Sequence, residues 1–148
     1  MSLIEDDTTL VMTRTFAAAP EAVFDAWMVR DEWQAWVGPE GLNCEVPQME
    51  PRVGGAYRII MRRTDGQTMP VAGVFKLIER PTHFAFTWGW ENDPGRQSLI
   101  TITLKAVPGG TEMTFRQEGL GTSENRDNHE RGWSSAFNKL AAYLGKGG

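Results

Sequence analysis

The stretch FAFTWGW, from Phe84 to Trp90, places a large aromatic residue at every second position. Alternate side chains of a β-strand point to the same face, so this spacing predicts a strand with one aromatic face and one small or polar face. Two interpretations of the aromatic face remain open. The whole row is ordinary core, or its far end, at Trp88 and Trp90, lines a cavity that holds a ligand.

Strand-like patterns extend on both sides of this stretch, across residues 43–117. An Asp-Gly pair at Asp65 and a Pro-Gly-Gly turn at Pro108 predict two β-hairpins. Pro47 cannot donate a backbone hydrogen bond, which places the strand that contains it at the edge of a sheet. Because hairpins join antiparallel neighbours, we expect one antiparallel sheet with an apolar face.

Helical patterns lie before and after this region. A strand at residues 9–16 is followed by two short helices, the first of which begins at Pro20. A long helix is expected from about Ser123, a suitable N-cap, to Leu144. Its apolar stripe, at a spacing of three to four residues, comprises His129, Trp133, Ala136, Phe137, Leu140 and Leu144. Such a helix would cover the apolar face of the sheet, which predicts an α+β fold.

Composition narrows the class of protein. The 148 residues suit one domain, and we expect it to span residues 9–145 after a disordered or cloning-derived segment at 1–8. The net charge of −4 and the scattered basic residues argue against nucleic acid as a partner. With no stretch long enough to span a membrane, no signal peptide and a single cysteine, Cys44, the sequence predicts a cytoplasmic protein.

The sequence contains no catalytic signature and no metal-binding spacing. Its two histidines and one cysteine are far apart, which does not fit a zinc site, and we expect no metal and no cofactor. Paired glycines at Gly54 and Gly109 are interpreted as turn residues, because neither pair matches a phosphate-binding motif.

Several blocks of the sequence together resemble a known superfamily. In chain order they are RTFAAAPEAVFDAWMVRDEWQAWVGPEG, EPRVGGAYRIIM, FAFTWGWE, GGTEMTFRQEGL and HERGWSSAFNKLAAYL. Their order and spacing are similar to those of the START-like (SRPBCC) superfamily. Within it, the chain resembles the group related to the C-terminal domain of the activator of the 90-kDa heat-shock chaperone ATPase.

This resemblance implies a helix-grip fold, in which a curved antiparallel sheet of about six to seven strands wraps around the long C-terminal helix. Members of the superfamily bind lipids, sterols, plant hormones or polyketides between sheet and helix, and some are cyclases or aromatases. The chaperone activators carry an additional N-terminal domain that binds the chaperone. The 148 residues are too few to include that domain as well, so we expect ligand binding rather than chaperone binding.

The resemblance and the spacing together predict a hydrophobic or aromatic ligand, of unknown identity, between the sheet and the last helix. The expected ligand-binding residues are Trp88, Trp90, Phe86, Tyr57, Phe75, Trp133 and Phe137 as walls, with His129 as a polar contact. Methionines such as Met61 and Met69 would give the lining an adaptable surface. The protein is expected to be a monomer or a homodimer.

Two alternatives stay open at this point. A cyclase- or hydrolase-like enzyme would need a polar pair inside the cavity, for example His129 with a carboxylate or with Tyr57. A chaperone cofactor or other interaction module would have a filled interior and an exposed apolar patch. A cavity of a few hundred Å³ between sheet and helix would favour ligand binding.

Overall fold

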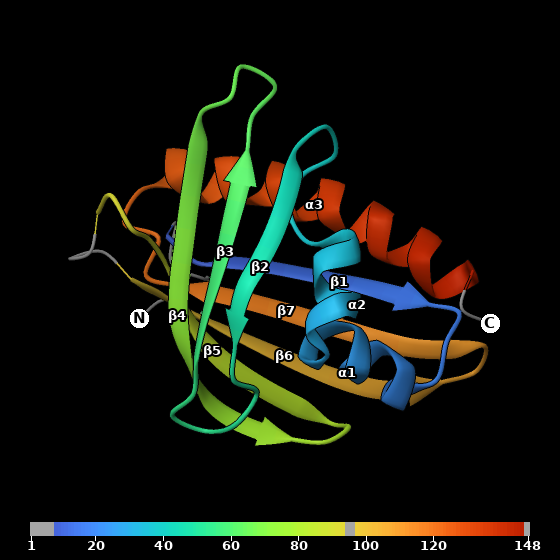
Figure 1. Cartoon of the computed structure of the whole chain (residues 1–148). Helices are drawn as coiled ribbons and strands as arrows, with labels where there is room; N and C mark the ends of the chain where they lie inside the picture. The colour runs from blue at the N-terminus through green and yellow to red at the C-terminus, as the bar shows by residue number, and fades with distance from the viewer. Residues whose placement is uncertain (1–7, 94–96, 147–148) are drawn as a thin grey trace.

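Seven antiparallel strands form one curved sheet in the computed structural model, which describes residues 8–93 and 97–146 (Figure 1). The strands are β1 (Leu10–Phe16), β2 (Asn43–Met49), β3 (Ala56–Arg62), β4 (Thr68–Glu79), β5 (His83–Trp90), β6 (Ser98–Val107) and β7 (Gly110–Glu118). The helices of the described part are α1 (Pro20–Met28), α2 (Arg30–Trp36) and α3 (Ser123–Lys146). The predicted α+β helix-grip fold is therefore confirmed.

The strand order across the sheet is β1-β7-β6-β5-β4-β3-β2. Consecutive strands from β2 to β7 are antiparallel neighbours, and β1 pairs with β7. Strand β2 lies at one edge, as Pro47 predicts, and its pairing with β3 shifts register between Glu45 and Gln48. The proline thus occupies the irregular part of an edge strand, where its missing N–H costs least.

Helix α3 crosses one face of the sheet, and α1 and α2 pack beside it (Figure 1). Trp27 of α1 and Trp36 of α2 both contact Phe137 of α3, with ring centroids 6.2 and 6.5 Å apart. The indole nitrogen of Trp36 also donates to the carbonyl of Ala26 at 2.9 Å. These contacts join the three helices into one layer over the sheet.

The aromatic row of β5 divides along the strand. Phe84 and Phe86 are fully buried, Trp88 is 4% exposed, and Trp90 is only partly buried. Phe86 lies among four rings of other elements at centroid distances of 5.6 to 6.1 Å, namely those of Trp27, Trp33, Tyr57 and Phe75. The first half of the row is therefore core, and burial decreases toward Trp90.

A bulge in β4 changes which of its side chains face the core. The alternation in the sequence predicts that Phe75 and Leu77 share the inward face, but the register shifts between these two residues. Phe75 pairs with Phe86, and Ile78 pairs with Phe84, so Ile78 packs against the core in place of Leu77. The prediction for Leu77 was wrong because one extra residue in a bulge reverses the alternation that follows.

The start of α3 also differs from the expectation. Ser123 is the first helical residue, and the cap is Thr122, whose hydroxyl accepts a hydrogen bond from the backbone N–H of Asn125 at 3.0 Å. Both residues belong to the cap-forming types, so propensity alone could not choose between them.

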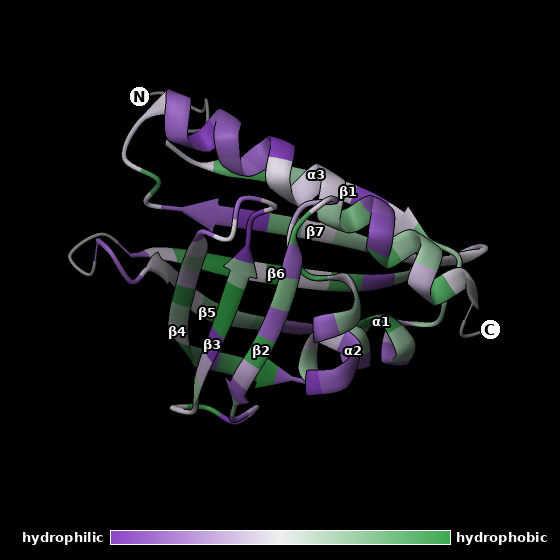
Figure 2. Cartoon of the chain, turned by 45° about the horizontal axis from the view of Figure 1, so that its top comes forward, coloured by the Kyte–Doolittle hydropathy of each residue, from purple (hydrophilic) through white to green (hydrophobic). Residues whose placement is uncertain are grey.

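Hydropathy follows the layers: apolar and polar residues alternate along the strands, and the first turns of α3 are hydrophilic (Figure 2). Among the described residues, no helix has the length and apolar content that crossing a bilayer requires. The expectation of a disordered or cloning-derived N-terminal segment falls, for residues 1–7, outside the described residues.

Candidate ligand-binding site

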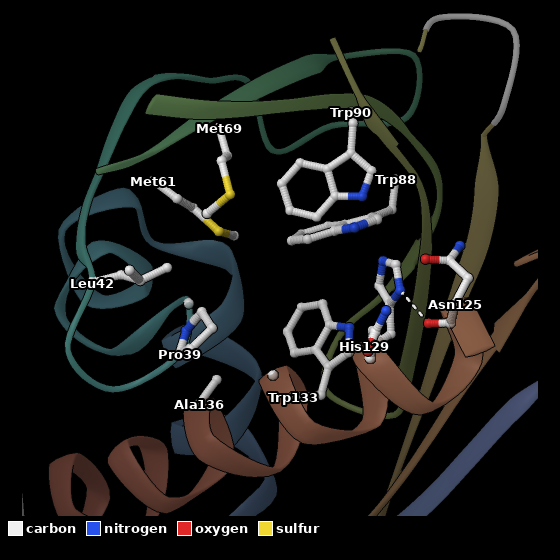
Figure 3. A pocket seen from close by; sticks show the side chains of 13 residues that line it. Pro39, Leu42, Met61, Met69, Trp88, Trp90, Asn125, His129, Trp133 and Ala136 are labelled. Carbon is white, nitrogen blue, oxygen red and sulfur yellow. Dashed lines mark hydrogen bonds between the residues drawn. The ribbon is translucent and has the colours of Figure 1, made fainter. Parts of the chain in front are cut away.

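A cavity of about 320 Å³ lies between α3 and the sheet, at the end where β5 finishes (Figure 3). The sheet contributes Met61 from β3, Met69 from β4, and Trp88 and Trp90 from β5. Helix α3 contributes Asn125, Asn128, His129, Gly132, Trp133 and Ala136. The segment between α2 and β2 lines a third side with Gly38, Pro39 and Leu42.

Most of this lining is apolar or aromatic, and none of the described lining residues carries a formal charge at pH 7 when His129 is neutral. The two methionines face the tryptophans across the cavity (Figure 3). Thioethers on flexible side chains adapt to ligands of different shapes and contact aromatic rings favourably. The volume lies at the lower end of the range for small-molecule pockets, which suits a compact apolar molecule.

Trp133 is held by a buried hydrogen-bond chain behind the cavity. Its indole nitrogen donates to Oε1 of Gln117 at 3.0 Å, and Nε2 of Gln117 donates to the hydroxyl of Ser98 at 2.8 Å. Ser98 in turn donates to the carbonyl of Trp88 at 3.1 Å. Because its N–H is engaged, Trp133 presents to the cavity an apolar ring whose orientation is determined by the sheet.

Trp88, Trp90 and His129 form an aromatic group at the cavity. The ring centroids of Trp88 and Trp90 are 6.2 Å apart, and those of Trp90 and His129 are 6.1 Å apart. The indole nitrogen of Trp88 and Nε2 of His129 are both buried and have no hydrogen-bond partner. Two polar atoms are therefore left unsatisfied beside an apolar space, which is uncommon for buried groups.

The hydrogen bond of His129 determines what its second nitrogen can do. Nδ1 lies 2.9 Å from the carbonyl oxygen of Asn125, one turn earlier in α3. A carbonyl only accepts, so Nδ1 carries the proton in the neutral ring and Nε2 is an acceptor. Burial lowers the pKa of His129 below its ordinary value, although the Asn125 carbonyl opposes this shift. The neutral ring is thereby favoured in the folded protein.

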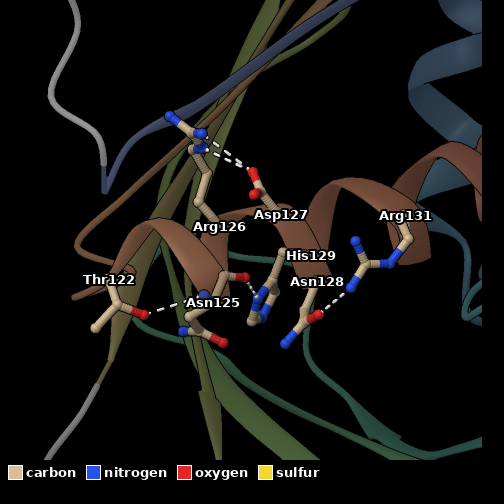
Figure 4. A network of polar contacts seen from close by, with 7 residues as sticks. All are labelled: Thr122, Asn125, Arg126, Asp127, Asn128, His129 and Arg131. Atoms are coloured by element: carbon tan, nitrogen blue, oxygen red, sulfur yellow. Dashed lines mark hydrogen bonds and ion pairs between the residues drawn. The ribbon is translucent and has the colours of Figure 1, made fainter.

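The first turns of α3 hold His129 in place (Figure 4). Thr122 caps the helix through the backbone N–H of Asn125, and the side-chain amide of Asn125 donates to the carbonyl of Leu120 at 2.8 Å. Next to His129, Asn128 accepts a hydrogen bond from Arg131. The helical turn that contains the Asn125 carbonyl, to which His129 donates, is thus held by the Thr122 cap and by the preceding loop.

The structure distributes the eight expected site residues between two places. Trp88, Trp90, Trp133 and His129 line the cavity. The other four, Phe86, Tyr57, Phe75 and Phe137, are at most 1% exposed and are not among the lining residues. These four form the aromatic core on which the cavity wall rests.

Tyr57 has a structural hydrogen bond in this core. Its hydroxyl donates to the carbonyl of Thr87 in β5, across the intervening strand β4. Burial raises the pKa of Tyr57 well above its ordinary value, so the phenol stays protonated. Tyr57 therefore does not provide His129 with a polar partner inside the cavity.

Several lining residues were not singled out from the sequence: Gly38, Pro39, Leu42, Asn125, Asn128 and Ala136. Gly38, Pro39 and Leu42 belong to a loop with no periodic pattern, so nothing in the sequence relates them to a cavity. Ala136 is on the predicted stripe of α3, but a small side chain gives no sign of an adjoining space. Gly132 also lines the cavity, and glycine is an unfavourable residue in the interior of a helix.

Cys44 and the acidic residues form no metal-binding group within the described part of the chain. The Cys44 thiol is buried beneath Gly38, and burial raises its pKa, with Lys139 acting in the opposite direction. Within the described residues, His, Cys, Asp and Glu side chains nowhere gather in the groups of three or more that a metal site needs.

A family model described as "Activator of Hsp90 ATPase homolog 1-like protein" matches residues 17–145. This match covers both walls of the cavity and nearly all of the fold. The chain belongs to this family. The resemblance inferred from the sequence blocks is thereby confirmed.

Solved structures support the same assignment. The AHSA1 protein from Silicibacter pomeroyi is 33% identical, with a TM-score of 0.82 over 95% of this chain and 99% of that chain. A protein from Chromobacterium violaceum is 27% identical, with a TM-score of 0.87 over 94% and 98% of the two chains. A protein from Rhodobacter sphaeroides is 26% identical, with a TM-score of 0.84 over 97% and 96%. No functionally curated protein matched the sequence.

Proposed function

We propose that this protein binds a small hydrophobic or aromatic molecule between its sheet and helix α3. The observation that carries the proposal is the cavity of about 320 Å³ with its lining of tryptophan, methionine and proline side chains. Side chains that line such a space have fewer packing contacts than core side chains, and a bound apolar ligand would supply these contacts. Trp88, Trp90 and Trp133 would form the walls, with His129 as the polar contact.

The enzyme alternative receives less support from the geometry. It needs a polar pair in the cavity, and the described lining contains His129 but no carboxylate and no tyrosine. The Tyr57 hydroxyl donates a hydrogen bond to the backbone carbonyl of Thr87 elsewhere in the core. With no acid–base partner for His129 among the described lining residues, binding is the better-supported use of this space.

The interaction-module alternative needs an exposed apolar patch. The exposed large hydrophobic residues of the described chain are Val11, Val29 and Val53, which lie on three separate segments. Single exposed residues of this kind are normal on a protein surface. The protein also contains a cavity, whereas the interaction-module alternative predicts a filled interior.

The sequence-based prediction of a cytoplasmic location stays a prediction.

Two glycines of α3 allow a matched test of ligand binding. A leucine at Gly132 would extend from the helix into the cavity, while Gly145 has no atoms within 4 Å of where its Cβ would be. We would titrate wild type, Gly132→Leu and Gly145→Leu with the neutral fluorescent probe N-phenyl-1-naphthylamine. We expect saturable binding to wild type and to Gly145→Leu, and binding at least about tenfold weaker to Gly132→Leu.

Both substitutions replace a glycine of α3 with leucine, one in the helix interior and one in its last turn, and only the substitution at Gly132 fills the cavity. Absence of a saturable response in wild type would refute the proposed function. Equal affinity in all three proteins would show that the probe binds outside the cavity, which would also refute it.

A further inference from the structure

The two unpartnered nitrogens at the cavity have complementary hydrogen-bonding roles. The indole Nε1–H of Trp88 can only donate, and Nε2 of neutral His129 can only accept, because Nδ1 donates to the Asn125 carbonyl. Figure 3 shows the second ring nitrogen of His129 turned toward Trp88. One ligand group that both accepts and donates would therefore satisfy both atoms.

A small hollow next to the cavity has room for such a group. It has a volume of about 20 Å³ and shares Trp88, Trp90, Asn125 and His129 with the main cavity. A space of about 10–15 Å³ is enough for one water-sized atom. The remaining walls of the hollow are formed by Ser98, Gly119 and Leu120.

Several other polar groups around the hollow already have partners. The Ser98 hydroxyl donates to the Trp88 carbonyl and accepts from Gln117, and the side-chain amide of Asn125 donates to the Leu120 carbonyl. Trp27 and Trp33 also have unpartnered indole nitrogens, but these two rings lie in the core and do not line either space. Trp88 and His129 thus differ from Trp27 and Trp33 because their unpartnered nitrogens belong to rings that border a space for a ligand.

From these contacts we infer that the preferred ligand is a neutral apolar molecule with one hydroxyl group. The hydroxyl oxygen accepts a hydrogen bond from Nε1–H of Trp88, and the hydroxyl O–H donates a hydrogen bond to Nε2 of His129. This inference rests on the proposed function, because it specifies the ligand of the same cavity. An ether or ketone only accepts, so it would leave the His129 acceptor unsatisfied.

A carboxylate fits this site less well than a hydroxyl. It accepts but does not donate, and the described lining provides no positive charge to compensate for its burial. An alkane or a simple arene would fill the main cavity and leave both nitrogens without partners. The site therefore discriminates between ligands of similar size by a single functional group.

Four naphthalene derivatives test this inference, since they share one ring system and differ in hydrogen bonding. At pH 7.5 we would measure how naphthalene, 2-methoxynaphthalene, 2-naphthol and 2-naphthoate displace N-phenyl-1-naphthylamine from the wild-type protein. We expect 2-naphthol to bind at least about tenfold more tightly than each of the other three. In His129→Phe, which keeps a ring but removes the acceptor, the preference for 2-naphthol over 2-methoxynaphthalene should fall below about twofold, because both oxygens can still accept from Trp88.

The outcomes separate the two levels of the proposal. If all four compounds displace the probe with similar affinity, or 2-naphthoate binds most tightly, the hydroxyl inference is overturned and ligand binding stands. If the probe itself shows no saturable binding, both are overturned. Should His129→Phe not fold, Trp88→Phe removes the donor instead, and an undiminished preference for 2-naphthol over naphthalene in that folded variant overturns the inference.

Discussion

The division of the aromatic strand into core and cavity wall leads to a paired substitution experiment. Phe86 is 1% exposed and contacts rings from α1, α2, β3 and β4, so Phe86→Ala removes a ring from a closely packed interior. Such truncations cost about 3–5 kcal/mol of unfolding free energy. For a domain of this size, that corresponds to a decrease in Tm of roughly 6–20 °C.

Trp90 lies on the same face of the same strand but borders the cavity. It is partly exposed and has ring contacts with Trp88 and His129. We expect Trp90→Ala to cost at most about 2 kcal/mol, because the side chain is less buried and its removal enlarges a space that already exists. The same variant should bind N-phenyl-1-naphthylamine several-fold more weakly, since it loses a wall of the site.

Urea unfolding followed by far-UV circular dichroism measures both free energies without relying on tryptophan fluorescence. Phe86→Leu is the control for binding: it keeps an apolar core residue and should leave probe affinity unchanged. If Trp90→Ala is as destabilising as Phe86→Ala, Trp90 belongs to the core. If Phe86→Leu weakens probe binding as much as Trp90→Ala does, the boundary between core and cavity is wrong.

Three further predictions concern single residues. Gly132→Ala should raise the unfolding free energy by about 0.5–1 kcal/mol in urea titrations, because the added Cβ lies 3.6 Å from Pro39 Cγ, an ordinary contact; a loss of stability would contradict this. Burial lowers the pKa of His129 below 6.5, so the unfolded chain takes up the proton at a higher pH than the folded chain does. The unfolding free energy of wild type should therefore decrease relative to that of His129→Gln as the pH falls below about 6.5. Parallel pH profiles of the two proteins would refute this. Burial raises the pKa of Cys44, so its reaction with a disulfide reagent at pH 8 should be at least about tenfold slower in the native protein than in urea, and equal rates would show an accessible thiol.

Local pattern was sufficient for most of the fold. Alternation at Phe84, Phe86 and Trp88 identified the inward face of β5, and Pro47 identified the edge strand, because both signals depend on neighbours within one strand. Leu77 is an exception. The change in its orientation is confined to β4, but the cause lies outside that strand. The bulge in β4 is stabilised by pairing with β5, which the pattern of β4 alone does not contain.

The candidate site was predicted only in part for the same reason. Trp88, Trp90, Trp133 and His129 could be named because the order of the blocks places a strand opposite a helix. Whether an aromatic ring meets another ring or an empty space depends on the side chain across from it. Phe86 meets Trp33 and Tyr57, whereas Trp88 borders a space beside Gly132 and Ala136, whose small side chains do not fill it.

The amino-acid sequence by itself thus determined the strands, the helices, the family and the direction in which the aromatic row faces. These properties follow from residue periodicity, turn chemistry and the order of the blocks. Only the tertiary structure decided where the core ends and the cavity begins, and that Nε2 of His129 and Nε1 of Trp88 lack partners. Cavities and unsatisfied atoms result from how residues distant in sequence pack in three dimensions, so no single segment encodes them.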